Sequence, residues 1–197
     1  DSFAFGSTGI AMSLARIFKI THQNNYFDLL NKARCFKHEL EFSNVVKESK
    51  LFLSDHEYKF SCGNGVSGRI FGNLLTDYFL NIQINQAIEI DIDEFFKNAL
   101  GNTDGLIFGN TGNLEILKLI AIVKSDNTLD IRVDNYLEQI IDNYNKNGLF
   151  NFGIENPMMG FLGLFIGEAG IGYQMLRFAS WETVPSILAL ESTLLNI

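Results

Sequence analysis

Four glycine pairs of the form G-x-x-G, each directly in front of an apolar run, constrain this chain more than any other feature. The run after the first pair places Ile10, Leu14 and Ile17 at spacings of three and four, which is typical of a helix with one apolar face. A single G-x-x-G is weak evidence, but four copies at equivalent places indicate an internal repeat. The pairs are Gly6 and Gly9, Gly65 and Gly68, Gly109 and Gly112, and Gly167 and Gly170.

A more polar helical segment separates each glycine-led run from the next. Tyr26–Leu40 and Val133–Tyr144 carry apolar stripes opposite charged faces, and Asp93–Leu100 is a shorter candidate. Each repeat is therefore expected to be a helical hairpin, with three complete and a fourth begun at Gly167. The connections 43–60 and 148–160 lack helical periodicity and could hold short strands. With 2 prolines in 197 residues, the sequence predicts an all-α fold.

Composition narrows the class of protein. Hydrophobic residues make up 47% and charged ones 19%, which predicts one folded domain over residues 1–197. A net charge of −8 without a Lys/Arg cluster argues against nucleic acid as a partner. The longest apolar stretch, residues 158–167, is too short to span a membrane. Two cysteines, Cys35 and Cys62, and the lack of a signal-peptide pattern predict a cytoplasmic location.

The glycine turns suggest where a functional site would lie. Glycine allows backbones to approach closely, so the apolar helices can pack side by side as an inner wall. The amphipathic helices would then form an outer wall, and the turns would gather at one end of a ring. Side chains just before each G-x-x-G would converge at this mouth from different repeats.

Motifs around these turns resemble the lanthionine synthetase C-like family. Residues 3–10, F-A-F-G-S-T-G-I, resemble its G-F-A-H-G-x-x-G-I motif, and residues 105–115, G-L-I-F-G-N-T-G-N-L-E, resemble its C-H-G-x-x-G-N-L-E. Residues 163–173, G-L-F-I-G-E-A-G-I-G-Y, are similar to its closing G-L-M-x-G-x-A-G-I-G-Y. Residues 184–191, V-P-S-I-L-A-L-E, resemble the end of the cyclase domain in class II lanthipeptide synthetases.

The resemblance implies an α/α toroid, a barrel of seven helical hairpins of which this chain is the C-terminal half. It also implies addition of a peptide cysteine thiol to a dehydroalanine or dehydrobutyrine, with a zinc ion that lowers the pKa of the thiol. In the family the zinc ligands are a Cys of a W-C-x-G motif and the Cys-His of C-H-G. The His of G-F-A-H-G is assigned to proton transfer.

At these positions the chain departs from the family. Phe5 stands at the proton-transfer His, and Ile107 and Phe108 stand at the Cys-His pair. Residues 61–68, S-C-G-N-G-V-S-G, are similar to S-W-C-x-G-A-x-G, and the glycine register puts Gly63 at the ligand position. Cys62 then takes the Trp position, although a one-residue insertion would make it a remnant ligand. Because Phe, Ile and Gly cannot ligate zinc, we predict no metal and no catalytic residue among these positions.

Replacement ligands elsewhere are not expected. His22, His38 and His56 do not precede a glycine pair. Cys35 and His38 are three residues apart, but that helix face looks solvated. We therefore predict that the protein has no metal site.

The substitutions predict a pseudoenzyme. The leading hypothesis is a non-catalytic, cyclase-like domain in lanthipeptide modification that acts as a scaffold or holds a substrate peptide through Phe5, Phe108 and Phe165. An alternative places a dehydratase or cyclase activity in another domain or a partner chain. The expected partners are an N-terminal half of the toroid or an upstream dehydratase domain, because a half ring leaves apolar helices exposed at both edges.

A third possibility is a glycan-active enzyme, since helical toroids also occur in that class. Such enzymes need two carboxylates across a cleft. The acidic residues near the glycine turns are Asp104, Glu115 and Glu168.

Overall fold

The computed structural model describes residues 2–35, 59–82, 92–101, 103–152 and 162–191. Within these ranges every regular element is a helix, which confirms the all-α prediction. The one departure is an isolated antiparallel bridge between Thr103 and Phe152, at the start of the connection where strands were considered. The other such connection falls largely outside the described residues. No described helix is long and apolar enough to cross a bilayer.

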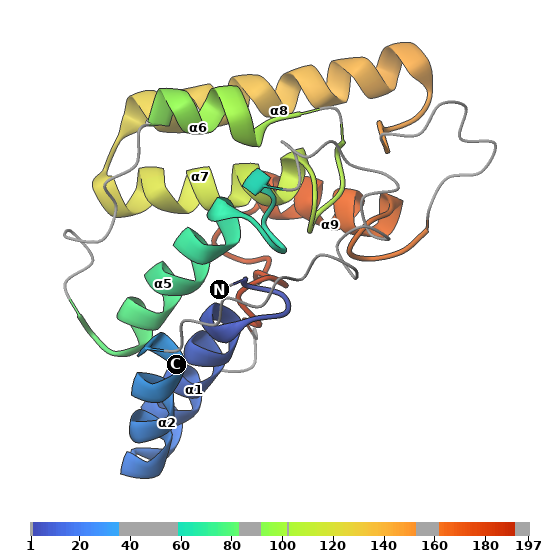
Figure 1. Ribbon diagram of the computed structural model, residues 1–197. Helices are drawn as coiled ribbons and strands as arrows, with labels where there is room; N and C mark the ends of the chain where they lie inside the picture. The colour runs from blue at the N-terminus through green and yellow to red at the C-terminus, as the bar shows by residue number, and fades with distance from the viewer. Residues whose placement is uncertain (1, 36–58, 83–91, 102, 153–161, 192–197) are drawn as a thin grey trace.

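The four predicted glycine-led helices are all present. Each begins one residue after the first glycine of its pair, and that glycine is the N-cap in an extended conformation. The four helices form the inner wall in Figure 1, and their glycine turns lie at the same end. They are α1 (Ser7–Thr21), α5 (Val66–Phe79), α7 (Asn110–Lys124) and α9 (Glu168–Ala179).

The second glycine of each pair is required first by the loop of its own repeat, in addition to the expected approach of a neighbour. The loop before each helix folds back onto the helix's own first turn. A Cβ at Gly112 would overlap the carbonyl oxygen of Leu106, and a Cβ at Gly68 would overlap that of Cys62. The same six-residue relation holds for Gly9 with Phe3 and Gly170 with Leu164. The glycine is thus required by the loop of its own repeat, and at Gly68 also by the adjacent repeat, since a Cβ there would lie 2.8 Å from the Phe3 Cβ.

Three amphipathic helices form the outer wall: α2 (Asn24–Cys35), α6 (Ile92–Ala99) and α8 (Asn127–Asn147). Helix α6 matches its prediction, whereas residues 36–40 of the predicted second helix lie outside the described residues. Helix α8 begins six residues before Val133, because Asp126 caps it by accepting a hydrogen bond from the Leu129 amide at 3.0 Å. Figure 1 shows α6 and α8 side by side over α7, and Arg132 of α8 bonds Asp93 of α6 at 2.7 Å.

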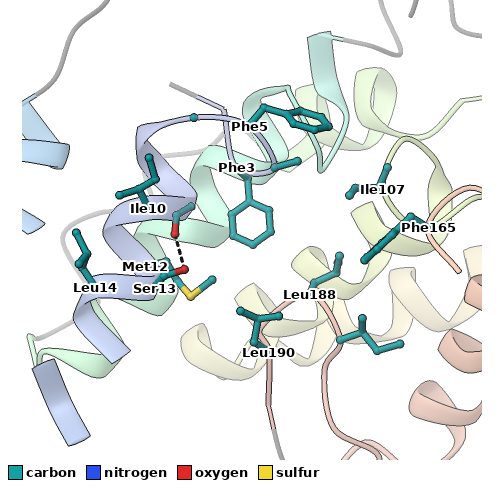
Figure 2. A pocket seen from close by; sticks show the side chains of 14 residues that line it. Phe3, Phe5, Ile10, Met12, Ser13, Leu14, Ile107, Phe165, Leu188 and Leu190 are labelled. Carbon is teal, nitrogen blue, oxygen red and sulfur yellow. Dashed lines mark hydrogen bonds between the residues drawn. The ribbon is translucent and has the colours of Figure 1, made fainter. Parts of the chain in front are cut away.

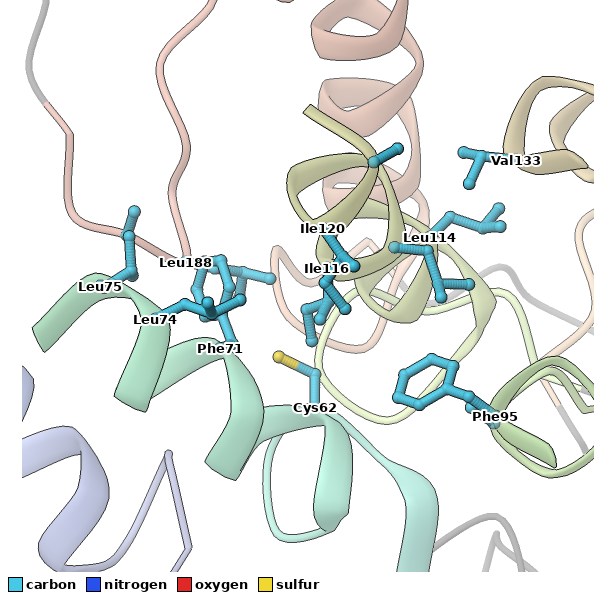
Figure 3. Packing of buried hydrophobic residues seen from close by; sticks show 14 of the residues in the cluster. Cys62, Phe71, Leu74, Leu75, Phe95, Leu114, Ile116, Ile120, Val133 and Leu188 are labelled. Atoms are coloured by element: carbon cyan, nitrogen blue, oxygen red, sulfur yellow. The ribbon is translucent and has the colours of Figure 1, made fainter. Parts of the chain in front are cut away.

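The core lies between the inner helices and extends between α7 and the outer helices α6 and α8, with aromatic and aliphatic side chains. Phe71 of α5 and Leu114, Ile116 and Ile120 of α7 are at most 2% exposed. Figure 3 shows the Cys62 side chain pointing into this cluster from the loop before α5. Burial of such side chains contributes about 1.5–3 kcal/mol each, so the core holds α5 and α7 together.

A buried ion pair joins α7, α9 and the C-terminal motif. Glu115 of α7, 1% exposed, accepts hydrogen bonds from the Arg177 Nε at 3.1 Å and from the Gln174 amide. Arg177 also donates to the Val184 carbonyl and to Glu191, and the Ser186 amide donates to Glu191 at 2.6 Å. The N-L-E motif and the V-P-S-x-L-x-L-E motif are therefore two sides of one network.

Replacing Arg177 by methionine is expected to lower the free energy of unfolding by about 3–5 kcal/mol, because it leaves the Glu115 carboxylate buried without its counter-ion. The double variant Glu115→Met/Arg177→Met should cost well below the sum of the two single changes. Urea unfolding of the three variants measures this coupling. Additive costs would show that the two side chains do not interact.

Candidate functional site

Backbone hydrogen bonds join the four glycine turns in order. The Ala4 amide donates to the Gly63 carbonyl at 2.8 Å, the Gly63 amide to Ile107 at 2.7 Å, and the Ile107 amide to Phe165 at 2.9 Å. All four residues stand two positions before the first glycine of their pair, so the bonds repeat in register. The turns thus converge as predicted, and they define the mouth of the inner wall.

An apolar cavity of about 660 Å³ opens at this mouth. Phe5, Ile107 and Phe165 line it, which brings three of the predicted residues together. Figure 2 shows Phe3 pointing into the space between α1 and the chain near Leu188. We call this space the mouth cavity.

The mouth cavity has almost no hydrogen-bonding capacity from side chains. Ser13 is the one polar side chain among the described residues that line it, and its hydroxyl donates to the Gly9 carbonyl at 2.9 Å. Phe5 stands at the rim with 73% of its surface exposed, and Phe165 is 46% exposed. The cavity therefore favours an apolar group and offers nothing to bind a charge.

Phe108 does not line the mouth cavity. A Cβ added at Gly63 would lie 2.9 Å from its ring carbon Cε1 and 3.3 Å from the Ile107 carbonyl oxygen. The Phe108 ring thus occupies the space in which a side chain at position 63 would begin. Phe5 and Phe165 can contact a ligand in the cavity, whereas Phe108 closes the neighbouring turn.

The glycine register places Cys62 away from the mouth. It stands three residues before its glycine, as Leu106 does in the next repeat, and both are 0% exposed. Burial, and secondarily the charge of Glu115, raises the pKa of the Cys62 thiol, so the thiolate is disfavoured. Cys62 is a core residue in this structure, in agreement with the reading of no insertion.

The residues at the family's ligand positions do not fit a zinc ion. Gly63 has no side chain, and Ile107 and Phe108 offer no thiolate, imidazole or carboxylate. Among the described residues, no three His, Cys, Asp or Glu side chains come together as a group that could hold a metal. His22 caps the C-terminus of α1, Cys35 is exposed, and His38 and His56 lie outside the described residues.

Two of the three acidic residues near the turns, Asp104 and Glu115, are engaged in the fold and are not a carboxylate pair for glycan hydrolysis. Glu115 is bound to Arg177 in the core. Asp104 accepts hydrogen bonds from the Asn110 side chain and the Asn151 amide, both at 2.9 Å, and is 6% exposed. Both carboxylates therefore have structural partners, which disfavours the glycan-active reading.

The sequence did not identify half of the mouth cavity. Met12 and Leu14 line it from α1, and Leu188 and Leu190 line it from the C-terminal motif. The sequence signal for the latter two is the run of four apolar residues, I-L-A-L, in V-P-S-I-L-A-L-E. The sequence does not show that Leu188 and Leu190 lie beside α1. Arg16 of α1 donates a hydrogen bond to the Leu190 carbonyl, and 174 residues separate the two.

The structure has an inner wall of glycine-led helices and an outer wall of amphipathic helices. The resemblance to the lanthionine synthetase C-like family implies this arrangement, and a family model supports the same assignment. The model of the lanthionine synthetase C-like proteins matches residues 1–189, so the chain belongs to this family. A search of curated proteins gave no significant match.

Proposed function

We propose that this chain is a cyclase-like domain of lanthipeptide modification, of the class II type, that lacks zinc and thioether-forming activity. Its role is to hold a substrate peptide or to serve as a scaffold in the cytoplasm. The observation that carries the proposal is the apolar mouth cavity at the place of the family's metal chemistry. Phe5 lines it at the position of the family's proton-transfer histidine, and Ile107 lines it at the position of a zinc-ligating cysteine.

Filling a former metal site with apolar side chains has a physical reason. Polar groups left in a closed site without their metal would be buried without partners, which costs about 1–3 kcal/mol each. Aromatic and aliphatic side chains remove that cost and leave an apolar surface. The result is a site that can bind a side chain of a peptide but cannot activate its thiol.

Replacing Phe5 by aspartate tests peptide binding at the mouth cavity. The change places a charge at the rim of an apolar site, and Phe5 is too exposed for the fold to depend on it. We expect the Kd for a fluorescent peptide of alternating Phe and Ser to rise about ten-fold or more, as measured by anisotropy. Ile131→Asp, a similarly exposed change on the outer helix α8, is the control. Equal affinities for Phe5→Asp and the natural protein would refute binding at the mouth.

The scaffold role rests on apolar surface at both ends of the inner wall. On α1, Ile10 and Ile20 are 56% and 51% exposed, and beyond α7 Leu162 and Leu176 are 80% and 62% exposed. An N-terminal half of the toroid, in the same polypeptide or in a partner chain, would bury both surfaces. A sharp monomeric unfolding transition of residues 1–197 alone would contradict this pairing.

The second candidate function keeps an activity outside this chain. A dehydratase domain upstream, or a cyclase in a partner chain, would act on a peptide that this domain positions. The same exposed edges are the surfaces that would contact such a domain.

A further inference from the structure

A second, polar groove of about 520 Å³ lies next to the mouth and plays no part in the proposal above. Gly101 and Asp104 line it from the loop before α7, and the other wall is a face of α8. Ile107 of the same loop lines the mouth cavity. Asp104 and Ile107 are three residues apart, at most about 10 Å, so a single extended ligand can reach both. We call this space the amide groove.

Three amide side chains line the amide groove from α8. Gln139, Asn143 and Asn147 recur every fourth residue and therefore share one helix face. All three are exposed. Within the described part of the chain, none of the three side-chain amides has a hydrogen-bond partner, so each offers a donor and an acceptor to a ligand.

The floor of the amide groove is held by hydrogen bonds and carries Asp104, the one charged side chain among the described residues that line it. The Asp104 carboxylate accepts hydrogen bonds from Asn110 Nδ2 and from the Asn151 amide, and Asn110 also exchanges two hydrogen bonds with the Gly101 backbone. Burial raises the pKa of Asp104. The described residues that line the groove include a carboxyl group and no cation, which disfavours phosphates and other anions, and the amides suit a neutral ligand.

The spacing of the amides matches an extended polypeptide. Residues four apart on a helix rise about 6.0 Å, and alternate residues of an extended chain rise about 6.6 Å. Each peptide unit presents one N–H and one C=O, the complement of a side-chain amide. From Gln139 to Asn147 the row spans about 12 Å, the length of about four extended residues.

We infer that the amide groove binds the extended backbone of the peptide whose apolar side chain occupies the mouth cavity. This inference rests on the proposed function and adds a second contact region to it. The bound peptide crosses the 104–107 loop. The mouth cavity selects an apolar side chain, and the amides of α8 bind peptide N–H and C=O groups, which are the same in every sequence. The site would therefore accept peptides of varied sequence that share an apolar anchor.

The test uses two synthetic peptides of about eight residues, one Phe followed by Ala and Ser, which suffices to cross the loop and cover the amide row. In the second peptide the nitrogens of alternate residues after the Phe are methylated, which removes backbone donors. We expect Asn143→Ala/Asn147→Ala to weaken binding of the first peptide about ten-fold. The same change should weaken binding of the methylated peptide by a clearly smaller factor, because that peptide keeps its carbonyl acceptors but lacks the donors. Asn145→Ala is the matched control, because position 145 lies on the opposite face of α8.

Phe5→Asp separates this inference from the proposed function. If Phe5→Asp weakens both peptides but the double asparagine variant weakens neither, the mouth binds peptide and the groove inference is overturned. If neither peptide binds the natural protein at millimolar concentration, both are overturned. Displacement of the first peptide by a cello-oligosaccharide from the natural protein, but not from Asn143→Ala/Asn147→Ala, would assign the groove to a glycan and overturn it as well.

Discussion

Replacing Gly112 by alanine is expected to lower the free energy of unfolding by about 3 kcal/mol. The added Cβ would overlap the Leu106 carbonyl oxygen, and both are backbone groups of one tight loop. Neither can move without breaking the turn, because the next residue, Ile107, is held between its neighbours by two backbone hydrogen bonds. Thermal unfolding followed by circular dichroism measures the loss.

Gly172→Ala is the matched control within the same family of helices. Gly172 lies in α9 with nothing within 4 Å of its Cβ position. Alanine has the higher helix propensity by about 1 kcal/mol, so this change should raise the unfolding midpoint. If Gly112→Ala and Gly172→Ala shift the unfolding midpoint in the same direction, the loop does not approach the helix closely at Gly112.

The repeat could be predicted because its cause is local. Each first glycine stands directly before an apolar run, and the helix starts at the next residue in every case. The predicted start of α8 is six residues late, although Asp126 is a residue type that caps helices. The apolar stripe begins only at Val133, so periodicity alone does not show the cap in front of it.

The mouth could be predicted only in part, because its geometry depends on contacts between repeats. Counting from the glycines correctly brought Phe5, Ile107 and Phe165 to one place. The same counting cannot show that the Phe108 ring turns toward Gly63. Nor can it bring Leu188 beside α1, since that contact joins the two ends of the described chain.

A Cβ at Gly63 would meet the Phe108 ring, so we expect a zinc site at these turns to require changes at both positions together, and this coupling can be tested by building the site. The natural protein is expected to purify without stoichiometric zinc. Gly63→Cys alone should bind none, because its Cβ would lie 2.9 Å from the Phe108 ring. Ile107→Cys/Phe108→His alone supplies two ligands, fewer than the three that protein zinc sites use at minimum.

The triple variant Gly63→Cys/Ile107→Cys/Phe108→His is expected to bind about one zinc ion per chain. Positions 63 and 107 lie in neighbouring glycine turns and are joined by a 2.7 Å backbone hydrogen bond. Removal of the Phe108 ring opens the space that a side chain at position 63 needs. Elemental analysis after gel filtration measures the bound metal. The same triple with Gly63→Ser in place of Gly63→Cys is the control of equal size, and it should retain little zinc.

Adding Cys62→Ala to the triple variant tests the register of the second glycine turn. Because Cys62 is fully buried in the core, beside residues such as Phe71 and Ile116, its thiol should not reach the metal, and zinc content should stay unchanged. Loss of zinc on this change alone would make Cys62 a ligand and would place an insertion in the turn. The Gly63→Ser control gives a second check. If it binds zinc and loses that zinc when Cys62→Ala is added, Cys62 is the ligand and position 63 is not.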